Sequence, residues 1–188
     1  MISVPAKTAD EMRLLGRRLA SVLRAGDLVI LSGPLGAGKT TLTQGIADGL
    51  GVRGPITSPT FVIARVHPPL RSPAGSHGAG PHGAGAGPGA RGPALVHADA
   101  YRLGSVLELD DLDLDADLAS SVTVVEWGEG LAEGLSEDRL EISIAPAAPA
   151  DPGTEGDETA VLRTVSITGV GLRWQDIQLP PAEDADRL

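Results

Sequence analysis

Two segments near the N-terminus have the periodicity of helices. Apolar residues recur at three- and four-residue intervals over residues 8–23, where Thr8 or Asp10 is available to cap the first turn. Residues 38–50 follow a glycine-rich turn and end at Gly51, a residue type that is common just beyond a helix. We therefore expect a helix in each segment.

Short apolar runs and alternating patterns predict the strands of a sheet. Residues 27–33 and 122–126 are continuous branched apolar runs, typical of strands that are buried on both faces. Apolar and polar residues alternate over 139–145 and 160–168, which predicts an antiparallel pair added at one side of the sheet. Two further strands are expected over 59–67 and 94–98. Strands and helices together indicate an α/β fold.

Segments without hydrophobic periodicity separate these elements. Residues 68–93 are dominated by Gly, Pro, Ala and Ser, and we predict a disordered insertion because such a segment cannot offset its ordering entropy. Residues 105–119 carry leucines among many carboxylates and predict one or two short helices. A loop rich in Pro, Gly and acidic residues is expected over 146–158. We predict one domain over 1–179, followed by a flexible tail at 180–188.

The composition is that of a globular protein and excludes several classes. The chain has 188 residues, 41% of them hydrophobic, and no apolar stretch reaches the roughly 20 residues that a membrane span needs. The net charge of −10 disfavours direct, tight binding to nucleic acid, because phosphate backbones repel an acidic surface. The chain has no cysteine, which excludes disulfides and thiolate zinc sites. Because the N-terminus also lacks the pattern of a secretory signal, we expect a cytoplasmic protein.

One segment carries the pattern of a phosphate-binding loop. Residues 33–40 read Gly-Pro-Leu-Gly-Ala-Gly-Lys-Thr and connect a predicted strand to a predicted helix. In such loops the backbone amides and the positive end of the helix bind phosphate, while the Lys39 side chain reaches the β- and γ-phosphates. The Thr40 hydroxyl can bind Mg²⁺. The expected nucleotide-binding residues of this segment are Gly33, Leu35, Gly36, Ala37, Gly38, Lys39, Thr40 and Thr41.

Carboxylates stand at the ends of two predicted strands. Asp99 comes directly after the run at 94–98, and Glu126 ends the run at 122–126. Ligands of open α/β folds bind at the carboxyl ends of the strands, so both side chains are expected near the phosphate loop. We assign Glu126 to the metal, directly or through water, and Asp99 to water activation or to a supporting contact. Together with Lys39 they are the predicted catalytic residues.

The chemistry of two other features leaves alternatives open, and a third feature predicts no site. Residues 56–61 could be a switch with hydroxyls near the γ-phosphate, or a capped turn that enters a strand. Trp127 either packs in the core or covers the nucleotide. The four histidines do not predict a metal site, because three of them lie in or beside the segment at 68–93.

The expected nucleotide is ATP. Guanine recognition typically uses an Asn/Thr-Lys-x-Asp motif, whereas this chain has no asparagine and no lysine after Lys39. Two alternatives to an ATPase stay open. One is a small metabolite or nucleoside kinase, although no arginine-rich lid is evident, and the other is a binding module that is gated by nucleotide without hydrolysing it.

Four motifs follow one another along the chain and resemble a known family. They are the loop at 35–41, Thr57-Ser-Pro-Thr-Phe61, His97-x-Asp99-x-Tyr101-Arg102-Leu103 and Val125-Glu126-Trp127. The loop is common to many nucleotide-binding proteins, but the other three at this spacing are specific. From about residue 8 to 173 the chain resembles the ATPase subunit of bacterial tRNA threonylcarbamoyladenosine biosynthesis, the TsaE (YjeE) family.

The resemblance implies a fold, an activity and partners. The fold would be a phosphate-loop NTPase-like, three-layer sandwich with a mixed sheet. The activity would be a Mg²⁺-dependent ATPase, weak alone and stimulated by two sugar-kinase-like subunits that transfer threonylcarbamoyl to adenosine 37 of tRNA. The tRNA itself would be contacted only indirectly, and no membrane is involved.

The resemblance also implies roles for individual residues. Thr40 and Glu126 would be the magnesium ligands, and Asp99 would be essential. Thr60, in the switch-like segment, and Trp127 join the expected nucleotide-binding residues.

Two departures from the family pattern limit these roles. Pro34 stands where many members have Asp, which could change local contacts but leaves the backbone of the loop usable. The insertion at 68–93 is much longer than the usual connection, and it lies between the switch-like segment and Asp99. Such an insertion could affect partner docking, although low-complexity insertions are more often tolerated.

Overall fold

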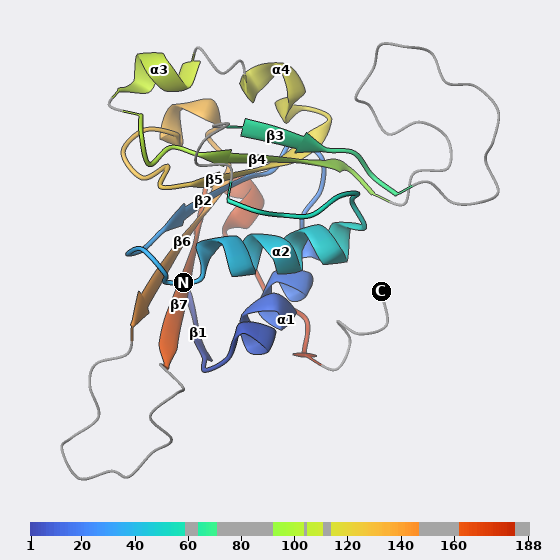
Figure 1. Cartoon of the computed structure of the whole chain (residues 1–188), viewed down its shortest axis with the longest axis vertical. Helices are drawn as coiled ribbons and strands as arrows, with labels where there is room; N and C mark the ends of the chain where they lie inside the picture. Colours follow the sequence, from blue (N-terminus) through green and yellow to red (C-terminus); the bar gives the residue numbers. More distant parts are fainter. Residues whose placement is uncertain (59–63, 71–91, 104, 111–113, 147–161, 183–188) are drawn as a thin grey trace, which may run out of the picture.

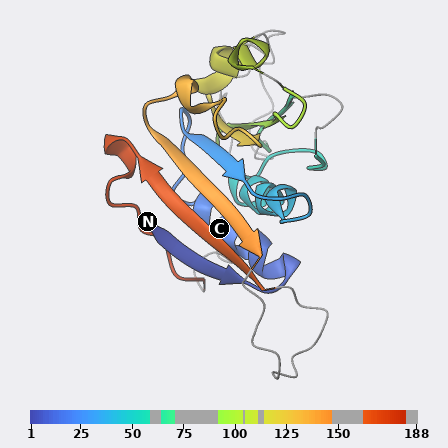
Figure 2. The same ribbon diagram turned by 90° about the vertical axis from the view of Figure 1, so that its left-hand side faces the viewer.

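Across residues 1–58, 64–70, 92–103, 105–110, 114–146 and 162–182, which the computed structural model describes, a seven-stranded sheet lies between two helical layers (Figures 1 and 2). The strands are β1 (Ile2–Ala6), β2 (Leu28–Ser32), β3 (Ala64–His67), β4 (Ala94–Asp99), β5 (Ser121–Glu126), β6 (Arg139–Pro146) and β7 (Arg163–Val170). The helices are α1 (Ala9–Ala20), α2 (Lys39–Leu50), α3 (Val106–Asp110) and α4 (Leu114–Leu118), with 3₁₀ turns η1 (Glu133–Leu135) and η2 (Leu172–Trp174).

The sheet is mixed, with the order β1-β7-β6-β2-β5-β4-β3. Its four central strands, β6, β2, β5 and β4, run parallel to one another. The outer strands β7, β1 and β3 are antiparallel to their neighbours. The predicted antiparallel pair is therefore confirmed as β6 and β7, and the two predicted buried strands, β2 and β5, lie side by side at the centre.

Most predicted elements are confirmed, and one strand was missed. The segment at 105–119 contains the two short helices α3 and α4, and Thr8 rather than Asp10 caps α1, accepting a hydrogen bond from the Glu11 amide. Strand β1 was not predicted, and it pairs with β7 at one edge of the sheet. The predicted strand at 59–67 is described only as β3, because 59–63 lie outside the described residues.

The segments predicted to be irregular fall mainly outside the described residues. These are 71–91 of the insertion, 147–158 of the predicted loop, and the tail from 183; 160–161 of the strand predicted at 160–168 also lie outside the described residues. No helix in the described ranges is long and apolar enough to cross a membrane.

The alternation of side chains along the strands builds a core on each face of the sheet. Leu31 of β2 and Val124 of β5 face α1 and α2, whereas Ile30 and Val125 face α3 and α4. Since Glu126 follows Val125, its side chain returns to the α2 face at the end of the strand. The same alternation in β4 puts Asp99 on that face, opposite Glu126 in the register of the two strands.

Helices α1 and α2 cross at glycines. A Cβ atom on Gly45 would lie 2.1 Å from the Arg13 carbonyl oxygen, and one on Gly16 would lie 2.4 Å from the Leu42 carbonyl oxygen. The two backbones therefore touch where a side chain would separate them. This contact holds α2, which begins at the phosphate loop, against the rest of the molecule (Figure 1).

Candidate functional site

The connection between β2 and α2 has the backbone that the phosphate-loop motif requires. Gly36 and Gly38 have φ angles of 76° and 109°, which side chains disfavour. A Cβ on Gly33 would lie 2.4 Å from the Ile144 carbonyl oxygen, so only glycine fits beneath the loop. No side chain caps α2 at Gly38, which leaves the amides of its first turn for an anionic ligand.

A cavity of about 340 Å³ joins this loop to the two predicted carboxylates. Its lining residues are Leu35, Gly36, Gly38, Lys39, Thr40, Thr41, Ser58, Asp99, Tyr101, Glu126 and Trp127. The structure thus brings together nearly all of the predicted site residues. Gly33 and Ala37 do not line the cavity: Gly33 contributes its carbonyl to Lys39, and Ala37 is buried below the loop. Thr60 lies outside the described residues.

The Lys39 ammonium group is held above the loop by backbone and aromatic contacts. Nζ donates hydrogen bonds to the carbonyl oxygens of Gly33 at 2.7 Å and Pro34 at 3.0 Å, and it lies 3.7 Å from the centroid of the Trp127 ring. Burial lowers the pKa of Lys39 below its usual 10.5, although the nearby carboxylates of Glu126 and Asp99 raise it in part. This cation is therefore poorly solvated, and a phosphate group would give it a strong partner.

The Glu126 carboxylate is buried and bound on both oxygens. Glu126 is the last residue of β5 and is only 2% exposed. Oε2 accepts a hydrogen bond from the Thr40 hydroxyl at 3.1 Å, and Oε1 lies 2.8 Å from Nε2 of His97. The two predicted magnesium ligands, Thr40 and Glu126, are therefore in direct contact.

The Asp99 carboxylate is oriented by two contacts from different segments. Its Oδ2 accepts a hydrogen bond from the Ser58 hydroxyl at 2.9 Å, and its Oδ1 accepts one from the Tyr101 amide at 3.0 Å. Ser58 belongs to the segment interpreted as a switch or a capped turn. The contact places this hydroxyl at the cavity, as the first of the two interpretations requires.

Two aromatic rings form one wall of the cavity. Trp127 has a φ angle of 60°, an uncommon conformation for a large residue, and its ring centroid lies 5.1 Å from that of Tyr101. Tyr101 is 58% exposed, so this wall is open to solvent. Trp127 both packs against the core on the α3 and α4 face and lines the cavity, so its placement agrees with both open interpretations.

The oxygen donors fit a magnesium ion that also binds a nucleotide. Mg²⁺ is usually held by one or two protein side chains, with phosphate oxygens and water completing its octahedron. Thr40 and Glu126 supply a hydroxyl and a carboxylate at the cavity wall. In the described part of the chain no group of three or more His, Asp or Glu side chains is arranged to hold a metal.

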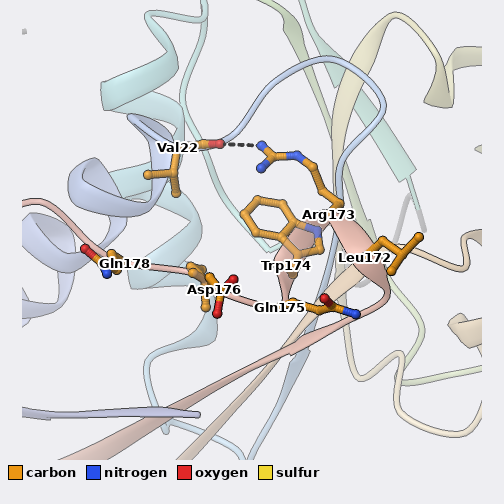
Figure 3. Close-up of a pocket in the computed structure, with 8 residues that line it drawn as sticks. Val22, Leu172, Arg173, Trp174, Gln175, Asp176 and Gln178 are labelled. Atoms are coloured by element: carbon orange, nitrogen blue, oxygen red, sulfur yellow. Dashed lines mark hydrogen bonds between the residues drawn. The ribbon is translucent and has the colours of Figure 1, made fainter.

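A second cavity, of about 520 Å³, lies beside η2 (Figure 3). Its wall includes Arg173, which stacks 4.0 Å from the ring of the buried Trp174 and donates hydrogen bonds to the Val22 carbonyl at 2.8 Å and the Asp27 carboxylate at 3.2 Å. These contacts fasten η2 to the turn that precedes β2. The terminal guanidinium nitrogen of Arg173 is thus engaged in holding the fold.

Three residues of the site belong to the motifs of the sequence analysis but were given no individual role there. Tyr101 and Ser58 line the cavity, and His97 lies directly behind Glu126. For His97 a signal was present in the sequence, since His97 and Asp99 are two residues apart in one strand and must share a face. This spacing does not by itself predict a site, because the other three histidines lie in or near the low-complexity segment.

Comparisons with known proteins agree on one family. A family model described as threonylcarbamoyl adenosine biosynthesis protein TsaE matches residues 6–151. A TsaE protein of Streptomyces coelicolor is 56% identical over 164 residues, which cover 87% of this chain and 93% of that protein. The TsaE protein of Bacillus subtilis is 32% identical over 167 residues, covering 88% and 84% of the two chains. Both carry the name tRNA threonylcarbamoyladenosine biosynthesis protein TsaE.

A solved structure matches the whole architecture. The crystal structure of Bacillus subtilis YdiB superposes with a TM-score of 0.60 at 28% identity, covering 93% of this chain and 88% of that one. Together with the mixed sheet and the loop between β2 and α2, this confirms the predicted α/β fold of the phosphate-loop NTPase type.

Proposed function

Because the chain belongs to the TsaE family of threonylcarbamoyl adenosine biosynthesis proteins, we propose that it is the subunit that binds and hydrolyses ATP in the machinery that makes N6-threonylcarbamoyladenosine at position 37 of tRNA. We place its action in the cytoplasm. Its partners would be the two sugar-kinase-like subunits that transfer the threonylcarbamoyl group, and tRNA would be reached only through them.

The observation that carries this proposal is the contact between Thr40 and Glu126 inside the cavity. A hydroxyl from the first turn of α2 and a carboxylate from the end of β5 meet at 3.1 Å beside Lys39. A loop that served only to turn the chain would not require a buried carboxylate at this point. The arrangement suits Mg·ATP: the loop would hold the phosphates, and Thr40 and Glu126 would hold the metal.

Each residue contributes a separate part of the proposed reaction. The amides of the loop and the first turn of α2 bind the phosphates, and Lys39 exchanges its carbonyl partners for phosphate oxygens. Thr40 and Glu126 hold Mg²⁺, which when bound would neutralise phosphate charge as the terminal bond breaks. Asp99, fixed by Ser58 and the Tyr101 amide, accepts a hydrogen bond from the attacking water and orients it.

Hydrolysis by the isolated chain is expected to be slow. Tyr101 and Trp127 form a wall that is open to solvent, and water weakens the electrostatic stabilisation of a developing charge. Docking of the partner complex over this wall would exclude water and complete the site. Repeated cycles of tRNA modification would then depend on ATP turnover.

The test is reconstitution of tRNA modification from purified proteins, with repeated turnovers followed by mass spectrometry of nucleosides. Lys39→Ala, Asp99→Ala and Glu126→Ala should each lower partner-stimulated ATPase activity by about 100-fold or more and stop modification after the first round. Asp48→Ala, an exposed change on α2, is the matched control and should behave as wild type.

The outcomes separate this proposal from its alternatives. A kinase would form ADP together with a phosphorylated small molecule and would not need the partner proteins. A nucleotide-gated binding module would support modification with ATP analogues that cannot be hydrolysed. If the three variants kept full partner-stimulated activity, the assigned roles would be wrong.

A further inference from the structure

We propose that His97 is a positioning residue, which holds one oxygen of Glu126 so that the other faces Thr40 and the magnesium ion. The inference rests on the proposed function, since it concerns the same carboxylate. It adds a residue that touches neither nucleotide nor metal and acts only through Glu126.

The proposal requires Nε2 of His97 to donate this hydrogen bond. His97 is completely buried in β4, and its Nε2 lies 2.8 Å from Oε1 of Glu126. An ionised Glu126 carboxylate can only accept, so the proposal puts the hydrogen on Nε2. The same carboxylate accepts the Thr40 hydroxyl on Oε2, so its two oxygens have separate partners.

Packing does not account for an imidazole at this position. Nδ1 of His97 is buried and has no hydrogen-bond partner within the described part of the chain. An unpartnered polar atom in the core is unfavourable, so leucine, which occupies position 95 on the same face of β4, would satisfy packing better. The contact with Glu126 is the feature that requires histidine.

The effect of this contact on Glu126 is orientation. A glutamate side chain has three rotatable bonds, and a single contact with Thr40 leaves the carboxylate free to turn. The donor on Oε1 comes from the adjacent strand β4, which is paired with β5 on one side and β3 on the other. Removing a hydrogen-bond partner of a metal ligand commonly lowers metal affinity by about 10–100-fold.

The experiment compares how strongly magnesium tightens ATP binding in the wild type and three variants. Calorimetry with ATP, in excess Mg²⁺ and then in EDTA, gives the magnesium ratio, which is the dissociation constant in EDTA divided by that in Mg²⁺. His97→Gln places an amide nitrogen where Nε2 lies and should keep that ratio within about twofold. His97→Asn is equally polar but too short to reach Glu126, and His97→Leu has no donor. In both variants the ratio should therefore fall by about 10–100-fold.

A purely structural role predicts a different pattern. It would lower the melting temperature of the variants while leaving the magnesium ratio of the folded protein unchanged. A wild-type ratio in folded His97→Asn or His97→Leu would therefore overturn the inference and leave the proposed function intact. A wild-type chain that binds ATP no more tightly with magnesium would overturn both.

A second measurement on the wild type does not depend on the variants folding. The ¹⁵N resonances of the His97 ring report which nitrogen carries hydrogen. We expect a hydrogen on Nε2. Hydrogen on Nδ1 alone would contradict the proposed contact, because Nε2 could then not donate to Glu126.

Discussion

Replacing Gly45 with alanine tests the helix contact that positions the phosphate loop. The added Cβ would lie 2.1 Å from the Arg13 carbonyl oxygen and 2.8 Å from its Cα. These are backbone atoms, so no side-chain rotation can relieve the overlap. Helices α1 and α2 would have to move apart, and the core between them, which includes Leu15 and Ile46, would loosen.

The expected destabilisation is the difference of two effects. Overpacking of this kind costs about 1–3 kcal/mol, and the short distance to a backbone atom argues for the upper end. Alanine in place of glycine within a helix recovers about 1 kcal/mol through its higher helix propensity. The net loss in the free energy of unfolding should be about 2 kcal/mol, which for a domain of this size lowers the melting temperature by roughly 4–8 °C.

Thermal unfolding followed by circular dichroism measures this loss, with Asp48→Ala as the control. Asp48 is exposed on the same helix, so its replacement raises helix propensity without any clash and should leave the melting temperature unchanged or slightly higher. A Gly45→Ala protein as stable as wild type would show that the two helices do not touch at this point.

Three further predictions concern single side chains. Thr40→Val should weaken ATP binding about 10–100-fold in magnesium but not in EDTA, whereas Thr40→Ser should keep it, as calorimetry can measure. In a Trp174→Phe background the fluorescence of Trp127 should change when Mg·ATP is added, because Lys39 leaves the ring for the phosphates; an unchanged spectrum would contradict this exchange. Burial lowers the pKa of His67 below 6.5, so the unfolded chain takes up a proton first and stability should fall as the pH drops from 6.5 toward the folded-state value. In melting experiments His67→Asn should lose this pH dependence. A wild-type protein that is equally stable at pH 7.5 and 5.5 would refute the prediction.

The central fold could be predicted because its strands are defined by local composition. The branched apolar runs of β2 and β5 are buried on both faces, and such runs have few other stable environments. Strand β1 lacked this signal. It is short, contains Pro5, and is half exposed, so its identity depends on pairing with β7, more than 150 residues away. Pairings over such distances are not encoded in any local pattern.

The candidate site was predictable for a related reason. Residues 33–40 have a local pattern, and Asp99 and Glu126 follow strands whose carboxyl ends must meet at one edge of a parallel sheet. His97 lies inside a strand rather than at its end, and only the contact across β4 and β5 distinguishes it from an ordinary buried residue. The two-residue spacing puts His97 on the same face as Asp99, but it does not show which side chain His97 contacts.

The charges around the cavity link magnesium to nucleotide in the proposed function. Of the described residues that line it, Asp99 and Glu126 carry negative charge and Lys39 carries positive charge, so the lining is net negative before any ligand binds. A triphosphate would be repelled by the two carboxylates, and burial amplifies that repulsion. A bound Mg²⁺ would change the net charge at the cavity from negative to positive, provided that Glu126 presents an oxygen to it. The strength of ATP binding should therefore depend on the orientation of the Glu126 carboxylate. Thr40 and His97 set that orientation together, because each contacts one of its two oxygens.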